Sequence, residues 1–234
     1  MEVDLGANFA EVNGRIEKAA AKSGRSARDI KMVAVTKTVE LKRIKEIVER
    51  GLRILGENRV QEMLEKVPTL PGDVEWHMIG RLQRNKVKHI IGKVGLIQSL
   101  DRWSLAEEIQ KRAQQNDTIV PVLVQLNLAG EDTKSGLAGN ELLDFLTEAA
   151  RLDHISVGGL MTIAPFTDDP EEVRPVFREM RKLADEMQGT IPGVKLDYLS
   201  MGMTNDFEIA IEEGANMVRI GSALFGSRVI KGGI

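Results

Sequence analysis

The fold follows from the stretch Ile30-Lys31-Met32-Val33-Ala34-Val35-Thr36-Lys37-Thr38 and the segment directly after it. This stretch is rich in apolar and β-branched residues, which favours a strand. Residues 41–50 instead space their apolar residues as a helix does, and Gly51 follows as a stop signal. A strand that leads into a helix and then into a second strand, at 52–56, is the unit of parallel α/β proteins.

The same unit repeats along the chain. Further strands are predicted at 74–80, 96–100, 120–128, 155–163, 196–200 and 217–224, with helices at 8–23, 59–67, 85–93, 104–115, 141–151, 170–187 and 206–213. Eight strands alternating with helices over roughly 200 residues favour an α/β fold with a single (β/α)8 TIM-type barrel and an extra N-terminal helix. A doubly wound open sheet shows the same alternation and remains the alternative.

The domain organisation is predicted to be simple. No linker is long enough to divide the chain, so residues 1–234 are expected to form one domain. The polar segment 130–139 is predicted to be a loop over one end of the fold.

Composition narrows the class of function. A net charge of −3 gives no broad field for nucleic acid or an anionic membrane. No apolar run approaches the roughly 20 residues of a membrane span, and the N-terminus lacks a secretory signal. The sequence has no cysteine, which excludes disulfides and thiolate catalysis. We therefore expect a cytoplasmic protein, with a monomer as the simplest state.

Metal chemistry is not expected. The three histidines are His77, His89 and His154, and they form no close-spaced ligand pair. His77 differs from the other two because it falls late in a predicted strand, where its ring could stack on a planar ligand.

Lys37 is the first candidate for chemistry. By strand alternation it shares a face with Val33 and Val35, so its amine is expected to be partly desolvated. A desolvated lysine is a nucleophile that can form a Schiff base with a carbonyl group. The alternative is that Lys37 only extends its amine to solvent at a strand end.

Two later segments have the character of an anion site. Ser200-Met201-Gly202-Met203-Thr204-Asn205-Asp206 follows the seventh strand, and Arg219-Ile220-Gly221-Ser222 lies at the eighth. TIM-type barrels often bind phosphate in the loops after these two strands. The alternatives are an ordinary turn with a helix cap at 204–205 and, for the buried Arg219, a structural ion pair.

Six segments of the sequence resemble one known family. These are 33–38, 56–62, 76–86, 158–164, 199–206 and 218–226, and together they span almost the whole chain in order. They are similar to the pyridoxal 5′-phosphate (PLP) homeostasis proteins, also called the PROSC or YggS-like family. The resemblance implies the barrel of the alanine racemase N-terminal domain, with PLP at its mouth.

The resemblance also implies roles for individual residues. Lys37 would be the Schiff-base lysine, and Arg219 would face the pyridine nitrogen. The phosphate would be held by Ser200, Gly202, Met203, Gly221 and Ser222, and the ring would be lined by Asn58, His77 and Met161. An arginine at the pyridine nitrogen disfavours ring protonation, which suits storage of PLP better than carbanion chemistry.

The expected function is PLP binding and intracellular PLP homeostasis, without substantial catalysis. Alanine racemases draw a catalytic tyrosine from a second domain, whereas the single tyrosine here, Tyr198, falls inside a predicted strand. Apo forms of PLP-dependent enzymes are possible recipients of the cofactor. The alternatives are a PLP-dependent racemase or decarboxylase, a cofactor-free Schiff-base aldolase, and a docking module that uses the basic segment 81–89.

Overall fold

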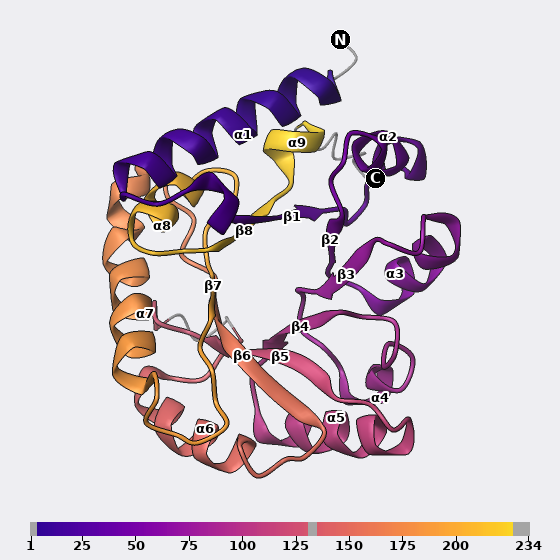
Figure 1. Cartoon of the computed structure of the whole chain (residues 1–234), viewed down its shortest axis with the longest axis vertical. Helices are drawn as coiled ribbons and strands as arrows, with labels where there is room; N and C mark the ends of the chain where they lie inside the picture. Colours follow the sequence, from indigo (N-terminus) through magenta and orange to yellow (C-terminus); the bar gives the residue numbers. More distant parts are fainter. Residues whose placement is uncertain (1–3, 131–134, 227–234) are drawn as a thin grey trace, which may run out of the picture.

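The structure is a computed structural model, and it describes residues 4–130 and 135–226. Residues 131–134 of the predicted polar loop lie outside the described residues. Within these ranges, eight parallel strands close into a barrel in sequence order, and β1 pairs with β8 (Figure 1). The register at the closure joins Val33 to Arg219. The prediction of a TIM-type barrel is confirmed, and the open sheet is excluded by the pairing of the first and last strands.

The strands and helices alternate along the chain. The strands are β1 (Lys31–Val35), β2 (Ile54–Glu57), β3 (Glu75–Met78), β4 (Leu96–Leu100), β5 (Val120–Leu126), β6 (Ile155–Thr162), β7 (Tyr198–Ser200) and β8 (Met217–Ile220). The α-helices are α1 (Leu5–Lys22), α2 (Leu41–Glu49), α3 (Val60–Lys66), α4 (Arg84–Val87), α5 (Trp103–Gln115), α6 (Leu142–Ala149), α7 (Arg174–Met187), α8 (Phe207–Glu212) and α9 (Ser222–Phe225).

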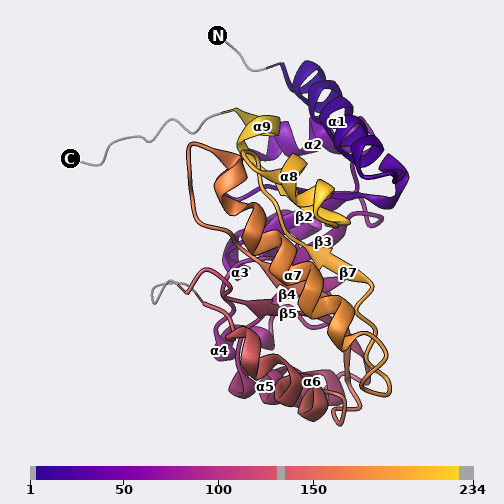
Figure 2. The ribbon, with the colours of Figure 1, turned by 90° about the vertical axis from the view of Figure 1, so that its left-hand side faces the viewer.

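The extra N-terminal helix is present as α1, which lies outside the barrel across α8 and α9 (Figures 1 and 2). Asp4 begins it by accepting a hydrogen bond from the amide of Ala7 at 2.9 Å. Its buried face includes Val12 and Ile16. Arg15 forms a bidentate ion pair with Glu208 of α8, with N–O distances of 2.7 and 3.1 Å.

Most predicted elements differ from the structure by a few residues at their ends, and two differ more. The eighth strand was predicted to run to Leu224, but it ends at Ile220 and residues 222–225 form α9. The amides of Leu224 and Phe225 donate to the carbonyl of Gly221, which turns the chain away from the barrel. The helix predicted at 85–93 is limited to α4, and hydrogen-bonded turns ending near Gly92 follow it.

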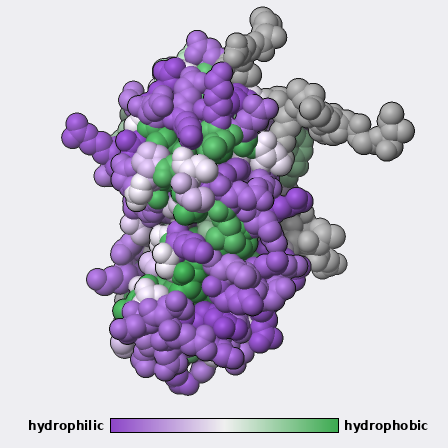
Figure 3. Space-filling model, turned by 90° about the vertical axis from the view of Figure 1, so that its right-hand side faces the viewer, coloured by the Kyte–Doolittle hydropathy of each residue, from purple (hydrophilic) through white to green (hydrophobic). Residues whose placement is uncertain are grey.

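The core has two parts. The larger lies between the strands and the surrounding helices, and the smaller fills the barrel with Val33, Leu96, Leu123, Met161 and Met217. The face that carries α2, α3 and α4 is largely hydrophilic, with separate small hydrophobic areas (Figure 3). Among the described residues, no helix is both long and apolar enough to cross a membrane.

Candidate functional site

A cavity of about 530 Å³ opens where β1, β6, β7 and β8 end. Five of the predicted site residues line it: Lys37, Met203, Arg219, Gly221 and Ser222. These residues are separated by up to 185 positions along the chain, as counted from Lys37 to Ser222. Barrel closure brings them together, because it places β1 beside β8. The cavity therefore lies at the end of the barrel where TIM-type enzymes bind their ligands.

Lys37 lies in a turn rather than in the strand itself. β1 ends at Val35, and Thr38 has a φ of +61°, a left-handed conformation that is uncommon for a β-branched residue. The amide of Thr38 donates a 2.8 Å hydrogen bond to Oε2 of Glu62 on α3. Lys37 is half-buried and lines the cavity together with Val35, whereas Val33, which was predicted to share their face, lies in the apolar filling of the barrel. The turn thus holds the amine side chain at the barrel mouth.

A buried polar cluster supports this turn from the outer side of the barrel. The Glu57 carboxylate is fully buried, and its Oε1 accepts hydrogen bonds from Thr36 Oγ1 at 2.6 Å and Lys66 Nζ at 2.7 Å. Lys66 Nζ also donates to the carbonyl oxygen of Thr36 at 2.8 Å. Burial raises the pKa of Glu57, while the hydrogen bonds from Lys66 and Thr36 oppose that rise. The residue before Lys37 is therefore fixed through both its side chain and its carbonyl.

Arg219 lies at the inner end of the cavity and is only 4% exposed. Its Nη1 donates to Ser200 Oγ at 2.6 Å, and its Nη2 donates to the carbonyl of Thr162 at 2.8 Å. Desolvation lowers the pKa of Arg219 to about 10, and the charge of Asp206 acts in the opposite direction. The guanidinium therefore remains protonated at neutral pH and gives the cavity a fixed positive charge.

A chain of hydrogen bonds runs from Arg219 through the barrel interior. Ser200 Oγ donates to Gln98 Oε1 at 2.6 Å, and Gln98 Nε2 lies 2.8 Å from His77 Nδ1. His77 Nε2 in turn lies 2.8 Å from Glu75 Oε1. The hydrogen bond to His77 lowers the pKa of Glu75. Ser200 and His77 therefore share Gln98 as a hydrogen-bond partner inside the barrel, and neither of them lines the cavity.

The loop after β7 supplies a second wall of the cavity. Gly202 adopts a φ of +91°, and a Cβ there would lie 2.6 Å from Ala210 Cβ and 2.8 Å from Phe207 Cα. Only glycine lets the loop pass this close to α8. The amide of Met203 donates a hydrogen bond to the carboxylate of Asp206. Burial raises the pKa of Asp206, and this hydrogen bond offsets part of that rise.

The remaining predicted residues lie elsewhere. Met161 is buried in the apolar filling of the barrel, and Asn58 lines a neighbouring cavity. The roles that the resemblance assigned to these residues, and to the five that line the cavity, stay predictions.

Several residues that line the cavity were not among the predicted cofactor-binding residues, although the segment 200–206 and the hydroxyl of Thr204 were considered for an anion site. They are Ile163, Ala164, Pro165, Phe166, Thr167 and Pro170 from the segment after β6, and Thr204, Asn205 and Asp206 from the loop after β7. The segment after β6 could have been found, because it too follows a strand end. Gln98 also carried a signal, since it is a polar residue inside an apolar strand.

Comparison with known proteins gives matches over nearly the whole chain. The family model of the alanine racemase N-terminal domain matches residues 11–229. The pyridoxal phosphate homeostasis protein of Aquifex aeolicus is 50% identical over 215 residues, which cover 92% of this chain and 94% of that protein. The protein of the same name from Escherichia coli is 35% identical and covers 96% of this chain and 97% of its own length.

Among solved structures, PipY of Synechococcus elongatus with PLP bound is 32% identical. It has a TM-score of 0.79 and covers 91% of this chain and 100% of its own. The closed barrel and the cavity at the ends of β1 and β8 fit these matches. The chain therefore belongs to the alanine racemase N-terminal domain family and, within it, to the pyridoxal phosphate homeostasis proteins.

Proposed function

We propose that the protein binds PLP as a Schiff base on Lys37 and takes part in intracellular PLP homeostasis, without substantial catalysis of its own. The observation that carries the proposal is that Lys37 and Arg219 line one cavity, which also contains the side chain of Ser222. A lysine amine can condense with an aldehyde, and the hydroxyls of Ser222 and Thr204 can donate hydrogen bonds to a phosphate.

The cavity fits the group in size and in the chemistry of its donors. Its volume of about 530 Å³ lies within the range of small-molecule sites. Arg219 is buried, charged and held by Ser200 and Thr162, so it can face the pyridine nitrogen without reorganising. Bound PLP supplies an electron sink, and a cation at the pyridine nitrogen weakens it. Arg219 therefore supports storage of the cofactor rather than racemisation or decarboxylation.

The position of Tyr198 supports the absence of racemase chemistry. It is the first residue of β7, and its hydroxyl lies 2.9 Å from Lys31 Nζ at the beginning of β1. Lys37 lies beyond the other end of β1. The only tyrosine in the sequence is therefore at the opposite end of the barrel from the proposed cofactor amine.

The names of the relatives and the PLP in PipY support the same cofactor for this chain. We also propose one domain, a monomer, a location in the cytoplasm, and transfer of PLP to apo-enzymes. The lack of cysteine suits a reducing compartment. The large apolar side chains that the described residues expose include Ile119, Leu143 and Phe166 on separate loops and helices, which suits a monomer.

The test is the absorption spectrum of the protein after incubation with PLP and removal of the excess. The expected result is a yellow protein whose visible band is lost on treatment with borohydride, which reduces a Schiff base. Lys37→Ala should remain colourless after the same incubation. Lys31→Ala removes a lysine from the other end of the same strand and should stay yellow. A Lys37→Ala variant as yellow as the unmodified protein would overturn the proposal.

A further inference from the structure

A second and larger cavity lies beside the proposed PLP pocket. It has a volume of about 940 Å³ and is lined from the ends of three neighbouring strands. Arg59 follows β2, the segment 80–86 follows β3, and Arg102 follows β4. The cavity is thus at the ligand-binding end of the barrel, although it shares no lining residue with the pocket of Lys37.

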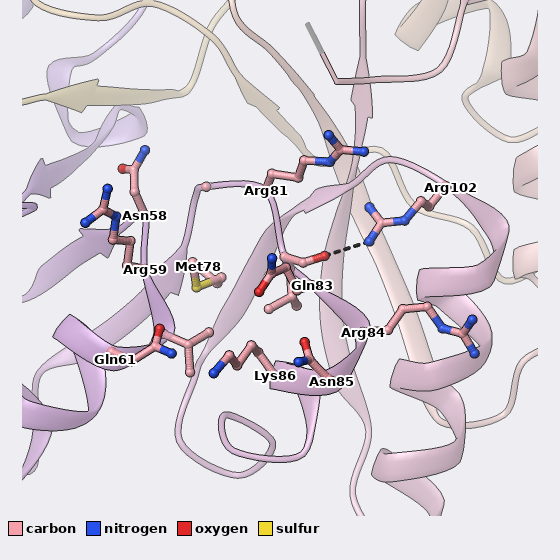
Figure 4. Close-up of a pocket in the computed structure, with 13 residues that line it drawn as sticks. Asn58, Arg59, Gln61, Met78, Arg81, Gln83, Arg84, Asn85, Lys86 and Arg102 are labelled. Atoms are coloured by element: carbon pink, nitrogen blue, oxygen red, sulfur yellow. Dashed lines mark hydrogen bonds between the residues drawn. The ribbon is translucent and has the colours of Figure 1, made fainter.

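The lining of this cavity is strongly basic. Its cationic side chains are Arg59, Arg81, Arg84, Lys86 and Arg102, and within the described part of the chain no acidic residue lines it. Figure 4 shows Arg59 on one side and Arg81, Arg84 and Arg102 on the other, with Gln83 and Lys86 between them. Charges of one sign that surround a concave space focus an attractive potential for anions.

The carboxylates nearby neutralise only part of this charge. Asp101 is buried and forms an ion pair with Arg102, whose Nη2 also donates to the carbonyl of Leu82 at 2.8 Å. Arg81 lies 3.9 Å from Asp101 and its side chain is 70% exposed. Glu108 is in electrostatic reach of Arg84, but it accepts a 2.7 Å hydrogen bond from Arg112. Asp101 therefore offsets the charge of Arg102 and part of that of Arg81, whereas Arg59, Arg84 and Lys86 form no ion pair within 4 Å among the described residues.

The other polar groups in the lining are amides. Asn58, Gln61, Gln83 and Asn85 are amide side chains that can hydrogen-bond to a neutral part of a ligand, and Met78 is a buried apolar residue beside them. The volume is that of a small-molecule site. Arginine forks match phosphate oxygens in a bidentate manner. A net charge of −3 for the whole chain provides no broad positive field, so a basic cavity of this size favours a small anion over a nucleic acid.

We propose that this basic cavity binds a phosphorylated small molecule at a site separate from the pocket of Lys37. The phosphate groups contact the arginine and lysine side chains, and the amide side chains contact the remainder of the ligand. The inference does not depend on PLP binding.

The test is calorimetric titration of the full chain with inorganic pyrophosphate and, in a second arm, with ADP. Arg84→Gln/Lys86→Gln removes two cations, and each charged hydrogen bond that is lost weakens binding by about tenfold or more. The matched control is Arg151→Gln/Lys182→Gln, which removes two cations from exposed ion pairs, one formed by Arg151 just after α6 and one formed by Lys182 on α7. The control and Lys37→Ala are expected to bind pyrophosphate as the unmodified protein does.

The two arms separate the sources of the phosphate. Tighter binding of ADP than of pyrophosphate indicates that the amides recognise a nucleoside, and equal binding indicates that the site recognises the phosphates alone; both support the proposal. It is overturned if pyrophosphate does not bind, if the cavity variant binds as tightly as the control, or if Lys37→Ala abolishes binding. Because the Lys37 variant is tested separately, failure here is distinguishable from failure of the PLP proposal.

Discussion

Ser200 and Ser222 are two hydroxyl residues to which the family resemblance gives the same role, yet their surroundings differ. Ser200 is fully buried between Arg219 and Gln98, with hydrogen bonds of 2.6 Å on both sides. Ser222 is exposed and lines the cavity. The structure therefore separates a residue that holds Arg219 in place from one that is available to a ligand.

Ser200→Ala is expected to lower the free energy of unfolding by about 1–3 kcal/mol, because it removes the hydrogen-bond partner of two buried atoms, Nη1 of Arg219 and Oε1 of Gln98. Ser222→Ala should change that free energy by less than about 0.5 kcal/mol, as exposed substitutions usually do, but should weaken PLP binding. Urea unfolding of both variants checks the first effect, and titration with PLP checks the second. Equal losses of stability in the two variants would contradict this assignment.

At the scale of elements, the turn between β7 and α8 depends on Gly202. A Cβ at this position meets the side chain of Ala210 and the backbone of Phe207 within 3 Å. Gly189, after α7, has a similar φ of +74°, but a Cβ there meets nothing within 4 Å. At both positions a residue other than glycine would therefore have a strained backbone, but only at Gly202 would its Cβ also collide with neighbouring atoms.

Gly189→Ala should lower the free energy of unfolding by about 1–2 kcal/mol, the cost of a left-handed conformation for an L-residue. Gly202→Ala should lower it by a further 1–3 kcal/mol or so, because the added methyl group overpacks the contact with α8. Chemical unfolding of the two variants measures the difference. A Gly202→Ala variant no less stable than Gly189→Ala would show that the close approach to α8 has no energetic consequence.

The bounds of a strand or helix could be predicted from the sequence where they depend only on neighbouring residues. β4 was predicted at its observed bounds, since an apolar run between turn signals is a local property. The end of β8 was not, because Ala223, Leu224 and Phe225 continue the apolar pattern of the strand although they form a short helix. Local pattern does not reveal that Gly221 redirects the chain at the barrel mouth.

The site residues also divide into those that local sequence pattern indicates and those whose contacts depend on closure of the barrel. Lys37 and the loops after β7 and β8 were chosen as candidates because they follow strand ends, where a barrel binds its ligands, and residues from all three line one cavity. The support given by Glu57 and Lys66 to Thr36, and the hydrogen bond of Gln98 to Ser200, join residues from different elements. Such pairings arise only when the barrel closes, so a single sequence carries no direct signal for them.

At the scale of the whole molecule, acid stability depends on carboxylates held by arginines between helices. Arg174 of α7 pairs with Glu212 of α8 at 2.8 Å and with Glu213 at 2.9 Å. The hydrogen bond from Arg174 lowers the pKa of Glu212 below its ordinary value of 4.5. The stabilisation is therefore fully present above that ordinary value and is lost as the pH falls through the lower folded-state pKa.

Arg174→Gln should reduce the free energy of unfolding near pH 6, and its difference from the unmodified protein should shrink as the pH falls toward 3. Arg151→Gln removes an arginine just after α6 from its exposed pair with Glu148 and should have little effect at either pH, as surface pairs contribute little. Urea unfolding across this pH range measures both. A difference for Arg174→Gln that stays constant with pH would contradict the linkage.

The attachment of PLP to Lys37 can be tested by reducing the PLP-loaded protein with borohydride, digesting it, and identifying the modified lysine by mass spectrometry. We expect the pyridoxyl group on the peptide that contains Lys37, and no adduct in the barrel of Lys37→Ala. An adduct found on Lys66 or Lys31 with Lys37 unmodified would contradict it.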